Sequence, residues 1–424
     1  MSLGLIAGIG REMLLSRLLG TGPDIEYFRL AFAVPNLLAT SLGVTLVSSM
    51  AALASGGGTD LRAAATVLRR LTTLALLVAI AVAGLGLASS PWIVPLLSPG
   101  YAESARIQVQ NLMPGLWGYF AVVAAGFGLR SFLAVRGRTW VAASSSLVLS
   151  GAMALGLLIT PCIAGRPPSG QDLVVLALIS AVTLAVHHLL ALRPTEWRGF
   201  WSGGRLVEPS ARLSEGLLLF TAVLAHAVAS APRLVDRSIA TEVGPGTVAA
   251  MDYSFAILTV PGVIFGTGLV TALVPAAAAS PSPLNEATRK AALAWITGAT
   301  LIGMVTGLVI ARFAAPLVDV VYGGGRFDAD SAQLTTALLS WHALALGPMI
   351  ASILLMQWLL ARNLALLVLL VAVARIAAKL AAVEWMVPRW GLDGLAASFL
   401  IPEITSALLL TCIVTARLSE RFAR

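Results

Sequence analysis

Charged residues are scarce in this chain. Only 11% of its 424 residues are Asp, Glu, Lys or Arg, while 58% are hydrophobic, whereas a typical soluble domain carries roughly 25% charged residues. The deficit excludes a chain built around one large soluble core. Apolar segments of about 20 residues recur along the whole length, and each can cross a hydrocarbon layer of roughly 30 Å. The sequence therefore predicts an all-α, multi-pass membrane protein.

Groups that carry chemistry are equally few. The two cysteines, Cys162 and Cys412, lie in different apolar stretches, and the four histidines are scattered, so neither a disulfide framework nor a metal site is indicated. The glycine-rich stretches 56–58 and 323–325 lack the following Lys-Ser/Thr of a phosphate loop, and we interpret them as turns. With no nucleophile constellation, the sequence predicts no cofactor, no metal and no enzymatic activity.

About twelve transmembrane helices are expected. We place them at 1–20, 24–53, 71–97, 109–135, 139–160, 172–192, 213–240, 247–278, 291–318, 332–360, 364–385 and 393–416. The first is barely long enough to span a bilayer. It contains Arg11 and Glu12 and lacks the basic leader of a cleavable signal peptide.

The basic residues predict the orientation. With the N-terminus in the cytoplasm, fifteen Lys and Arg residues fall in cytoplasmic loops and the tail, and four fall in the opposite loops. Cytoplasmic loops of membrane proteins are enriched in basic residues, so we expect both termini in the cytoplasm. The same bias explains the net charge of +8 without nucleic acid as a partner.

The two halves of the chain repeat. A gapless shift of 226 residues superimposes Arg, Gly-Thr, acidic-Tyr and Pro positions. The coinciding pairs are Arg11 and Arg237, Gly20 and Gly246, Thr21 and Thr247, Glu26 and Asp252, Tyr27 and Tyr253, Pro35 and Pro261, Val44 and Val270, Thr45 and Thr271, Tyr101 and Phe327, and Arg136 and Arg362. A parallel repeat with an even number of helices predicts two six-helix lobes, 1–192 and 213–424, joined by a basic cytoplasmic linker, 193–212. The site is expected between the lobes near the midplane.

Basic residues lie deep in the predicted membrane. Arg11 precedes Gly20 by nine residues, about 13 Å at helical rise. Its repeat mate Arg237 lies with Arg233 and Asp236 on one helical face. Charges at this depth usually face a cavity or a partner, so we expect Arg11, Arg233 and Arg237 to line a cavity, with Asp236 orienting one of them. A structural Arg–Asp pair that locks helices together is the alternative.

Two acidic residues and two prolines also coincide in the repeat. Glu26 and Asp252 lie near the outer starts of the second and eighth helices, where they predict gating ion pairs or a favourable helix-dipole contact. Arg29 follows Glu26 by three residues and is a candidate partner for it. Pro35 and Pro261 lie mid-helix, where a lost backbone hydrogen bond produces either a hinge or a packing kink.

A second charged group lies in the last two helices. Arg375 and Lys379 are four residues apart in the eleventh helix, and Glu403 lies in the twelfth. A buried pairing with Glu403 is one interpretation of these residues. Snorkelling of the long basic side chains to the membrane interface is the other.

The opening segment 10–38 is GREMLLSRLLGTGPDIEYFRLAFAVPNLL. It contains an Arg followed by an acid, R-x-x-G, an acid before an aromatic, and A-F-x-x-P-N-L-L. This pattern resembles that of the MurJ/MviN family of lipid II flippases, in the multidrug/oligosaccharidyl-lipid/polysaccharide exporter superfamily. The segment 234–275 and the stretches PGY at 99–101 and GRF at 325–327 are similar to further family motifs.

The resemblance implies two six-helix lobes and alternating access in a bacterial inner membrane. The implied cargo is an undecaprenyl-pyrophosphate-linked saccharide moved from the inner to the outer leaflet. Arginine binds diphosphate through paired charge-assisted hydrogen bonds, so Arg11, Arg29, Arg233 and Arg237 become the candidate substrate-binding residues. Membrane lipids and envelope-synthesis enzymes are the other expected partners.

The chain also departs from the family pattern. Lipid II flippases usually carry two further C-terminal helices after the twelfth, and the places of two family cavity arginines hold Ala39 and Ala256. A flippase for exopolysaccharide or O-antigen-type repeat units therefore stays open. So do a drug/cation antiporter of the same superfamily, which needs a midplane acidic site, and a non-transporting scaffold for envelope synthesis.

Overall fold

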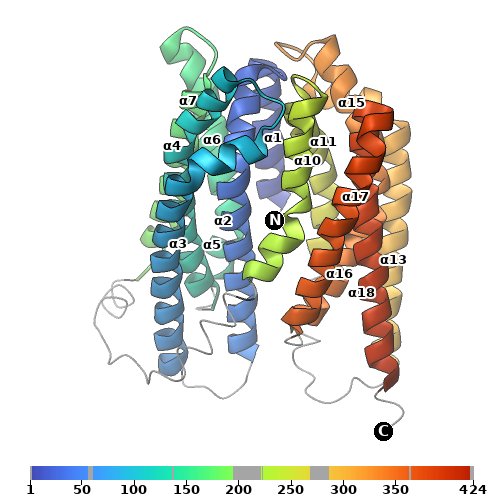
Figure 1. Ribbon diagram of the computed structural model, residues 1–424. Coiled ribbons are helices and arrows are strands. Elements are labelled where there is room, and N and C mark those ends of the chain that lie inside the picture. The colour runs from blue at the N-terminus through green and yellow to red at the C-terminus, as the bar shows by residue number, and fades with distance from the viewer. Residues whose placement is uncertain are drawn as a thin grey trace. The chain divides into compact units, whose positions relative to one another are not determined.

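The computed structural model is built of α-helices (Figure 1). It describes residues 2–55, 61–135, 138–193, 221, 223–267, 286–361 and 364–420. Over these ranges the only β-type pairing is an isolated bridge between Gly324 and Phe327. The chain divides into two compact units, 1–223 and 224–424, which we call lobe 1 and lobe 2. The predicted linker lies outside the described residues apart from residue 193, as do residues 56–58, Arg136, Val270, Thr271 and Arg362.

Lobe 1 is centred on one long helix. Its helices are α1 (Ser2–Leu19), α2 (Pro23–Ser55), α3 (Leu61–Leu97), α4 (Glu103–Val135), α5 (Thr139–Ala143), α6 (Ser145–Ala164) and α7 (Gly170–Leu190). Helix α4 contacts α2, α3 and α7, while α1 packs against α6. A Cβ at Gly4 would lie 2.1 Å from the hydroxyl of Ser146. Glycine therefore lets α1 approach α6 closely, and a larger residue would require the Ser146 hydroxyl to move.

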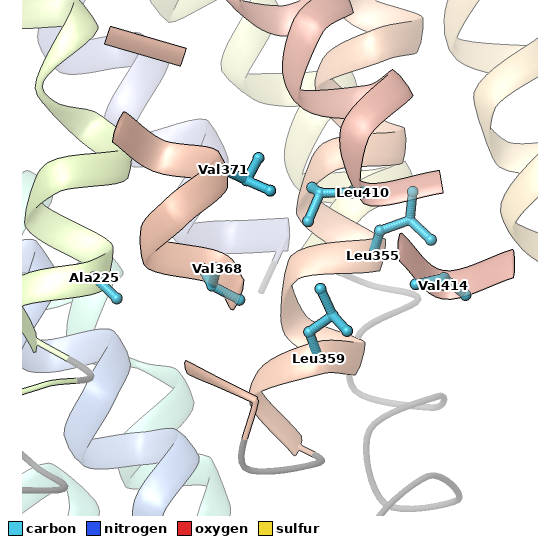
Figure 2. Close-up of a cluster of buried hydrophobic side chains, with 7 residues drawn as sticks. All are labelled: Ala225, Leu355, Leu359, Val368, Val371, Leu410 and Val414. Carbon is cyan, nitrogen blue, oxygen red and sulfur yellow. The ribbon is translucent and has the colours of Figure 1, made fainter. Parts of the chain in front are cut away.

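Lobe 2 has the same packing scheme. Its elements are α10 (Pro232–Val243), α11 (Thr247–Pro261), the π-helical η1 (Gly262–Thr267), α13 (Glu286–Arg312), α14 (Ala314–Tyr322), α15 (Ala329–Leu344), α16 (Leu346–Ala361), α17 (Ala365–Ser398) and α18 (Leu400–Glu420). The α15–α16 pair contacts α11, α13 and α18, and α10 packs against α17. Each contact has its counterpart in lobe 1. One apolar core of lobe 2, drawn in Figure 2, lies among α16, α17 and α18.

The internal repeat extends to helix ends and turns. Shifted by 226 residues, the bounds of α4 become the start of α15 and the end of α16, and the start of α5 becomes the start of α17. Two glycine pairs at this spacing have left-handed backbones: Gly20 and Gly246 with φ of 59° and 81°, and Gly165 and Gly391 with φ of 62° and 53°. The parallel repeat predicted from the sequence is confirmed.

Several predicted helices have different bounds in the structure. The helix predicted at 213–240 has a turn at Ala231, and Pro232 then opens α10, because proline fits the first helical turn and removes a hydrogen bond from a helix that precedes it. The span predicted at 332–360 bends by 53° between α15 and α16. The loop predicted at 386–392 lies inside α17, which is interrupted only by the non-helical Gly391.

Seven helices in the described part of the chain are long and apolar enough to cross a membrane, or eight if the bent α15–α16 pair is one span. Helix α1 is not among them, and it carries Arg11, Glu12 and Arg17 within 18 residues. Helix α10 has only 12 residues, three of which are Arg233, Asp236 and Arg237. These two helices hold the candidate site.

Replacing Gly165 by alanine is expected to destabilise the protein by about 1–2 kcal/mol, because a left-handed backbone is unfavourable for residues with a Cβ. No heavy atom lies within 4 Å of that Cβ, so the cost is backbone strain alone. Thermal unfolding of the purified protein measures it. Gly151→Ala is the control, since Gly151 lies inside α6 with the same open surroundings, and there alanine should stabilise the helix. Equal melting temperatures for both variants would contradict the strain argument.

Candidate functional site

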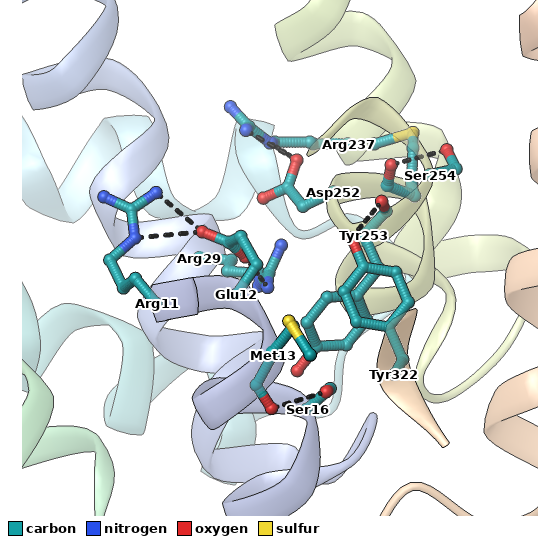
Figure 3. Close-up of polar contacts among 11 residues, drawn as sticks. Arg11, Glu12, Met13, Ser16, Arg29, Arg237, Asp252, Tyr253, Ser254 and Tyr322 are labelled. Carbon is teal, nitrogen blue, oxygen red and sulfur yellow. Dashed lines mark hydrogen bonds and ion pairs between the residues drawn. The ribbon is translucent and has the colours of Figure 1, made fainter. Parts of the chain in front are cut away.

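A buried glutamate joins two arginines in lobe 1 (Figure 3). The Glu12 Oε1 atom accepts hydrogen bonds from Arg11 Nη2 at 2.6 Å and Nε at 3.1 Å, and Oε2 accepts one from Arg29 Nη2 at 2.7 Å. The side chain of Arg29 is 7% exposed and that of Arg11 is 29% exposed. Glu12 thus fixes α1 to α2, and Arg11 is the member of the group that remains accessible.

Lobe 2 holds the repeat mate of Arg11 in a similar way. The Asp252 Oδ1 atom accepts hydrogen bonds from Arg237 Nη2 at 2.7 Å and Nε at 3.3 Å. In both lobes the Nε and Nη2 atoms of the arginine converge on one carboxylate oxygen (Figure 3). The carboxylate comes from different positions, because Glu12 adjoins Arg11 whereas Asp252 lies in the second turn of α11.

This geometry leaves part of each guanidinium for other acceptors. A guanidinium has five N–H donors arranged as two forks, and the carboxylate takes the Nε–Nη2 fork. Because the guanidinium is planar, its second fork, formed by N–H groups of Nη1 and Nη2, points away from that carboxylate. Phosphate oxygens match such a fork in spacing and charge. Arg11 and Arg237 therefore have the chemistry to bind a phosphate while their carboxylates keep them oriented.

Asp236 pairs with a lysine. It is 1% exposed and forms an ion pair with Lys379 of α17, which is 0% exposed and also donates to the Ser398 hydroxyl at 2.6 Å. Asp236 therefore forms its ion pair with Lys379 and not with Arg233 or Arg237, and its role in orienting an arginine stays a prediction. Lys379 does not snorkel, because α10 places a carboxylate next to its ammonium group. Asp236 and Lys379 together join α10 to α17.

The other predicted pair in the last two helices is present. Arg375 of α17 forms an ion pair with Glu403 of α18, whose side chain is 1% exposed. Of the two interpretations of this charged group, burial with pairing is confirmed. The ion pair joins α17 to α18, as the Asp236–Lys379 pair joins α17 to α10.

Arg233 has an aromatic partner. It lies in the first turn of α10, is exposed, and places its guanidinium carbon 5.3 Å from the centre of the Phe255 ring. The repeat mate of Phe255 is Arg29. Lobe 2 therefore has a cation–π contact at a position where lobe 1 has the Glu12–Arg29 ion pair, so the two lobes are not equivalent in charge.

Glu26 is buried at the start of α2. It is 3% exposed and lies beside Tyr101, whose ring meets that of Tyr27 edge to face with centroids 5.6 Å apart. Burial, together with the Glu26 carboxylate, raises the pKa of the Tyr101 phenol. The ion pair of Arg29 with Glu12 differs from the prediction, in which Glu26, three residues earlier, was the candidate partner of Arg29.

The chain matches a family of known description over nearly its whole length. Residues 15–424 match the family described as lipid II flippase MurJ. The chain belongs to that family. The MurJ/MviN resemblance found in the sequence is confirmed, and the family is one of membrane transporters rather than catalysts.

Individual relatives are distant in sequence. A lipid II flippase MurJ of Burkholderia cenocepacia is 25% identical over 126 residues, which cover 30% of this chain and 24% of that relative. A structure of lipid II flippase MurJ in an inward closed conformation has a TM-score of 0.77 at 14% identity and covers 97% of this chain and 86% of that one. An inward-facing multidrug resistance MATE family transporter has a TM-score of 0.77 at 15% identity, covering 99% and 96%. At these identities the structural likeness shows the fold alone, and it confirms the predicted all-α membrane-protein fold class.

Two site residues of this MurJ family member were missed in the sequence. Glu12 is the acid that follows Arg11 in the family pattern. Its repeat mate is the uncharged Ser238, so the internal repeat gave no signal for a charged residue at this position. Lys379 was noted without its partner Asp236. The signal for the pair was a lysine in the middle of an apolar span, because such a charge requires a counter-ion.

The two prolines and two alanines singled out in the sequence lie in different surroundings in the two lobes. Pro35 lies inside the continuous α2, whereas Pro261 ends α11 and is followed directly by π-helical η1. Their hinge role stays a prediction. Ala39 is 1% exposed and Ala256 is half-buried.

Within the described ranges, no three His, Cys, Asp or Glu side chains are grouped as a metal site requires.

Proposed function

We propose that this chain moves a polyprenyl-pyrophosphate-linked saccharide of the lipid II class from the inner to the outer leaflet by alternating access. Family membership supports the cargo class. The observation that carries the proposal is the matched pair Arg11 and Arg237, each held by one carboxylate through the same fork of its guanidinium.

The diphosphate is the part of the cargo that these arginines recognise. In this proposal each lobe supplies one arginine, whose free fork donates to phosphate oxygens, and Arg29 and Arg233 add positive charge. The ion pairs of Arg11 with Glu12 and of Arg237 with Asp252 stabilise the protein when no cargo is bound, because an unpaired charge within the membrane is unfavourable. Binding of the cargo then requires little rearrangement of either side chain.

Alternating access follows if the free forks of the arginines bind the diphosphate more tightly in one state than in the other. A ligand shifts a conformational equilibrium only through such a difference in affinity between the states. In the proposed cycle the arginines bind the diphosphate in one state and release it in the other, while their carboxylates keep them oriented in both. Glu26 contributes to the outer gate, and both termini lie in the cytoplasm.

The test is translocation of a fluorescent lipid-linked oligosaccharide by the reconstituted protein. Arg11→Ala and Arg237→Ala should each lower the rate about ten- to over a hundredfold, because one charged hydrogen-bond contact is worth roughly 1.5–3 kcal/mol. Arg11→Lys should also be damaging, since the charge stays but the fork is lost. Arg166→Ala is the control, because Arg166 is 52% exposed and pairs with Asp172 at the surface. Wild-type rates in both alanine variants would remove the arginines from the mechanism.

The alternative cargo, an exopolysaccharide or O-antigen-type repeat unit on the same carrier, is favoured by Ala39 and Ala256 at the places of two family cavity arginines. Both cargoes share the diphosphate, so the arginine variants do not separate them. Competition between lipid II and a lipid-linked repeat unit in the same assay does. Faster translocation of the repeat unit by the wild type would assign that cargo.

A further inference from the structure

A second polar cluster lies in lobe 1, away from Arg11. Two consecutive serines at the start of α6 face two consecutive histidines in the last turn of α7. Ser144 Oγ lies 2.9 Å from His187 Nε2, and Ser145 Oγ lies 3.0 Å from His188 Nε2. Together with Arg130 of α4 these four residues form what we call the Ser–His cluster. His188 and Ser145 are buried, while the other three members of the cluster are partly exposed.

The repeat supplies a direct comparison, because lobe 2 is apolar throughout the equivalent positions. The repeat mates of Arg130, Ser144, Ser145, His187 and His188 are Met356, Leu370, Val371, Ile413 and Val414. Figure 2 shows Val371 and Val414 within an apolar core that also contains Leu355, Leu359 and Leu410. The lobe 1 mates of those three leucines are Leu129, Leu133 and Leu184, which are also buried.

The fold therefore does not require polar groups at this place. Lobe 2 fills it with valines, and burying polar side chains costs free energy that their hydrogen bonds only offset. The leucines of this core are kept in both lobes. Polar groups stand for apolar ones at all five positions of the Ser–His cluster, which indicates a role for the cluster in lobe 1.

The hydrogen bonds define what the cluster offers. The hydroxyls of Ser144 and Ser145 each donate to a carbonyl three residues earlier, at 2.8 Å. A hydroxyl has one proton, so each Nε2 must donate to its serine, which sets the tautomer. With Nε2 as the donor, a neutral imidazole has only an acceptor at Nδ1, whereas a protonated imidazole has an Nδ1–H donor as well. The imidazoles are thus oriented by the serines, and the partly exposed His187 donates to an anion when it is protonated.

Arg130 adds a full positive charge to the same place. Gly126 of α4 packs against Leu184 of α7, so Arg130, one turn later, lies level with His188. The groups that act electrostatically on His188 are His187 and Arg130, both basic. The Nε atom of Arg130 is buried without a hydrogen-bond partner, and no carboxylate within the described residues forms an ion pair with this arginine.

We propose that the Ser–His cluster is a binding site for a phosphate group, with Arg130 and His187 as its contacts and Ser145 and His188 as the support that orients them. The shared chemistry is a phosphate ester or free phosphate with at least one negative charge. The cluster lies near the ends of α4 and α7 and the start of α6, within reach of lipid headgroups or of soluble phosphate. The site does not depend on the transported cargo.

The experiment titrates the purified wild type with inorganic phosphate and, separately, with short-chain phosphatidylglycerol, following the melting temperature. A saturable rise in melting temperature is expected with at least one of the two ligands. The ligand that produces it shows whether the bound phosphate comes from solution or from a lipid headgroup. Arg130→Met places the lobe 2 residue at this position and should weaken the apparent affinity at least tenfold. Arg166→Ala is the matched control and should bind as the wild type does.

The double variant Ser145→Val and His188→Val separates binding from folding, because lobe 2 packs valines at these positions. It should melt no lower than the wild type without ligand, and its affinity should fall at least tenfold. Saturable binding that Arg130→Met and the double variant both leave unchanged would overturn the proposal, as would a wild type that binds neither ligand. Translocation assays of Arg11 and Arg237 variants are unaffected by either result, so failure of this site is distinguishable from failure of the proposed function.

Discussion

Replacing Lys379 by methionine is expected to lose roughly 3–5 kcal/mol of stability, the cost of removing one partner from a buried ion pair. Lys379 is 0% exposed and Asp236 is 1% exposed, so the remaining carboxylate cannot be solvated. Since a domain is typically stable by only about 5–15 kcal/mol, this loss is a large share of the total, and the melting temperature should fall clearly. Melting temperature and the yield of monodisperse protein measure the effect.

The control for this prediction is the double variant Lys379→Met with Asp236→Leu. Replacing both partners of a buried pair with apolar residues is often neutral or stabilising, and the repeat mate of Lys379 in lobe 1 is Met153. The double variant should therefore recover most of the lost stability. A single variant as stable as the wild type would show that Arg233 and Arg237, which also act electrostatically on Asp236, suffice as its counter-charges.

Glu12→Gln is expected to have the second large effect, on both stability and transport. The glutamine side chain is the same size, but it is neutral and has only one acceptor oxygen where Glu12 uses two for Arg11 and Arg29. Each charged hydrogen bond contributes roughly 1.5–3 kcal/mol. Arg11 then loses the contact that orients its free fork, so translocation should fall at least tenfold. Thermal unfolding and the reconstituted translocation assay measure the two effects.

Glu103→Gln is the matched control for Glu12→Gln. Glu103 is also a helical glutamate of lobe 1, but its side chain is 79% exposed and lies 4.0 Å from Arg106. Surface ion pairs contribute about 0–1 kcal/mol, so stability and transport should both stay near wild type. If Glu12→Gln behaves as this control does, Glu12 has no part in holding the arginines.

The membrane class, the repeat and most helix positions could be predicted because each depends on local composition. An apolar run of about 20 residues forms a membrane helix largely irrespective of its neighbours, and the 226-residue shift is visible as coinciding letters. Positions such as the turn at Ala231 and the bend between α15 and α16 were missed. A helix can break within an apolar segment without any change in hydropathy, and Pro232 was the only local signal for the first of these breaks.

The partners of the charged residues could be predicted only in part. Arg375 and Glu403 were candidates for a buried pair, and they form one. Asp236 was assigned to the arginines on its own helix face, yet its ion pair is with Lys379 on α17. Residues on one helix share a face by periodicity, whereas contact with another helix depends on how far each is rotated and shifted along its axis.

The sequence by itself determined that this chain is a multi-pass helical membrane protein of two repeated halves. It also placed arginines deep in the first and seventh predicted helices. Hydropathy and internal repetition can be determined from the order of the amino acids alone, without the tertiary structure. Only the tertiary structure decided which carboxylate holds each arginine, that Lys379 is buried with Asp236, and that a Ser–His cluster in lobe 1 replaces an apolar core of lobe 2. Such pairings join residues far apart in the sequence, so helix packing alone sets their distances.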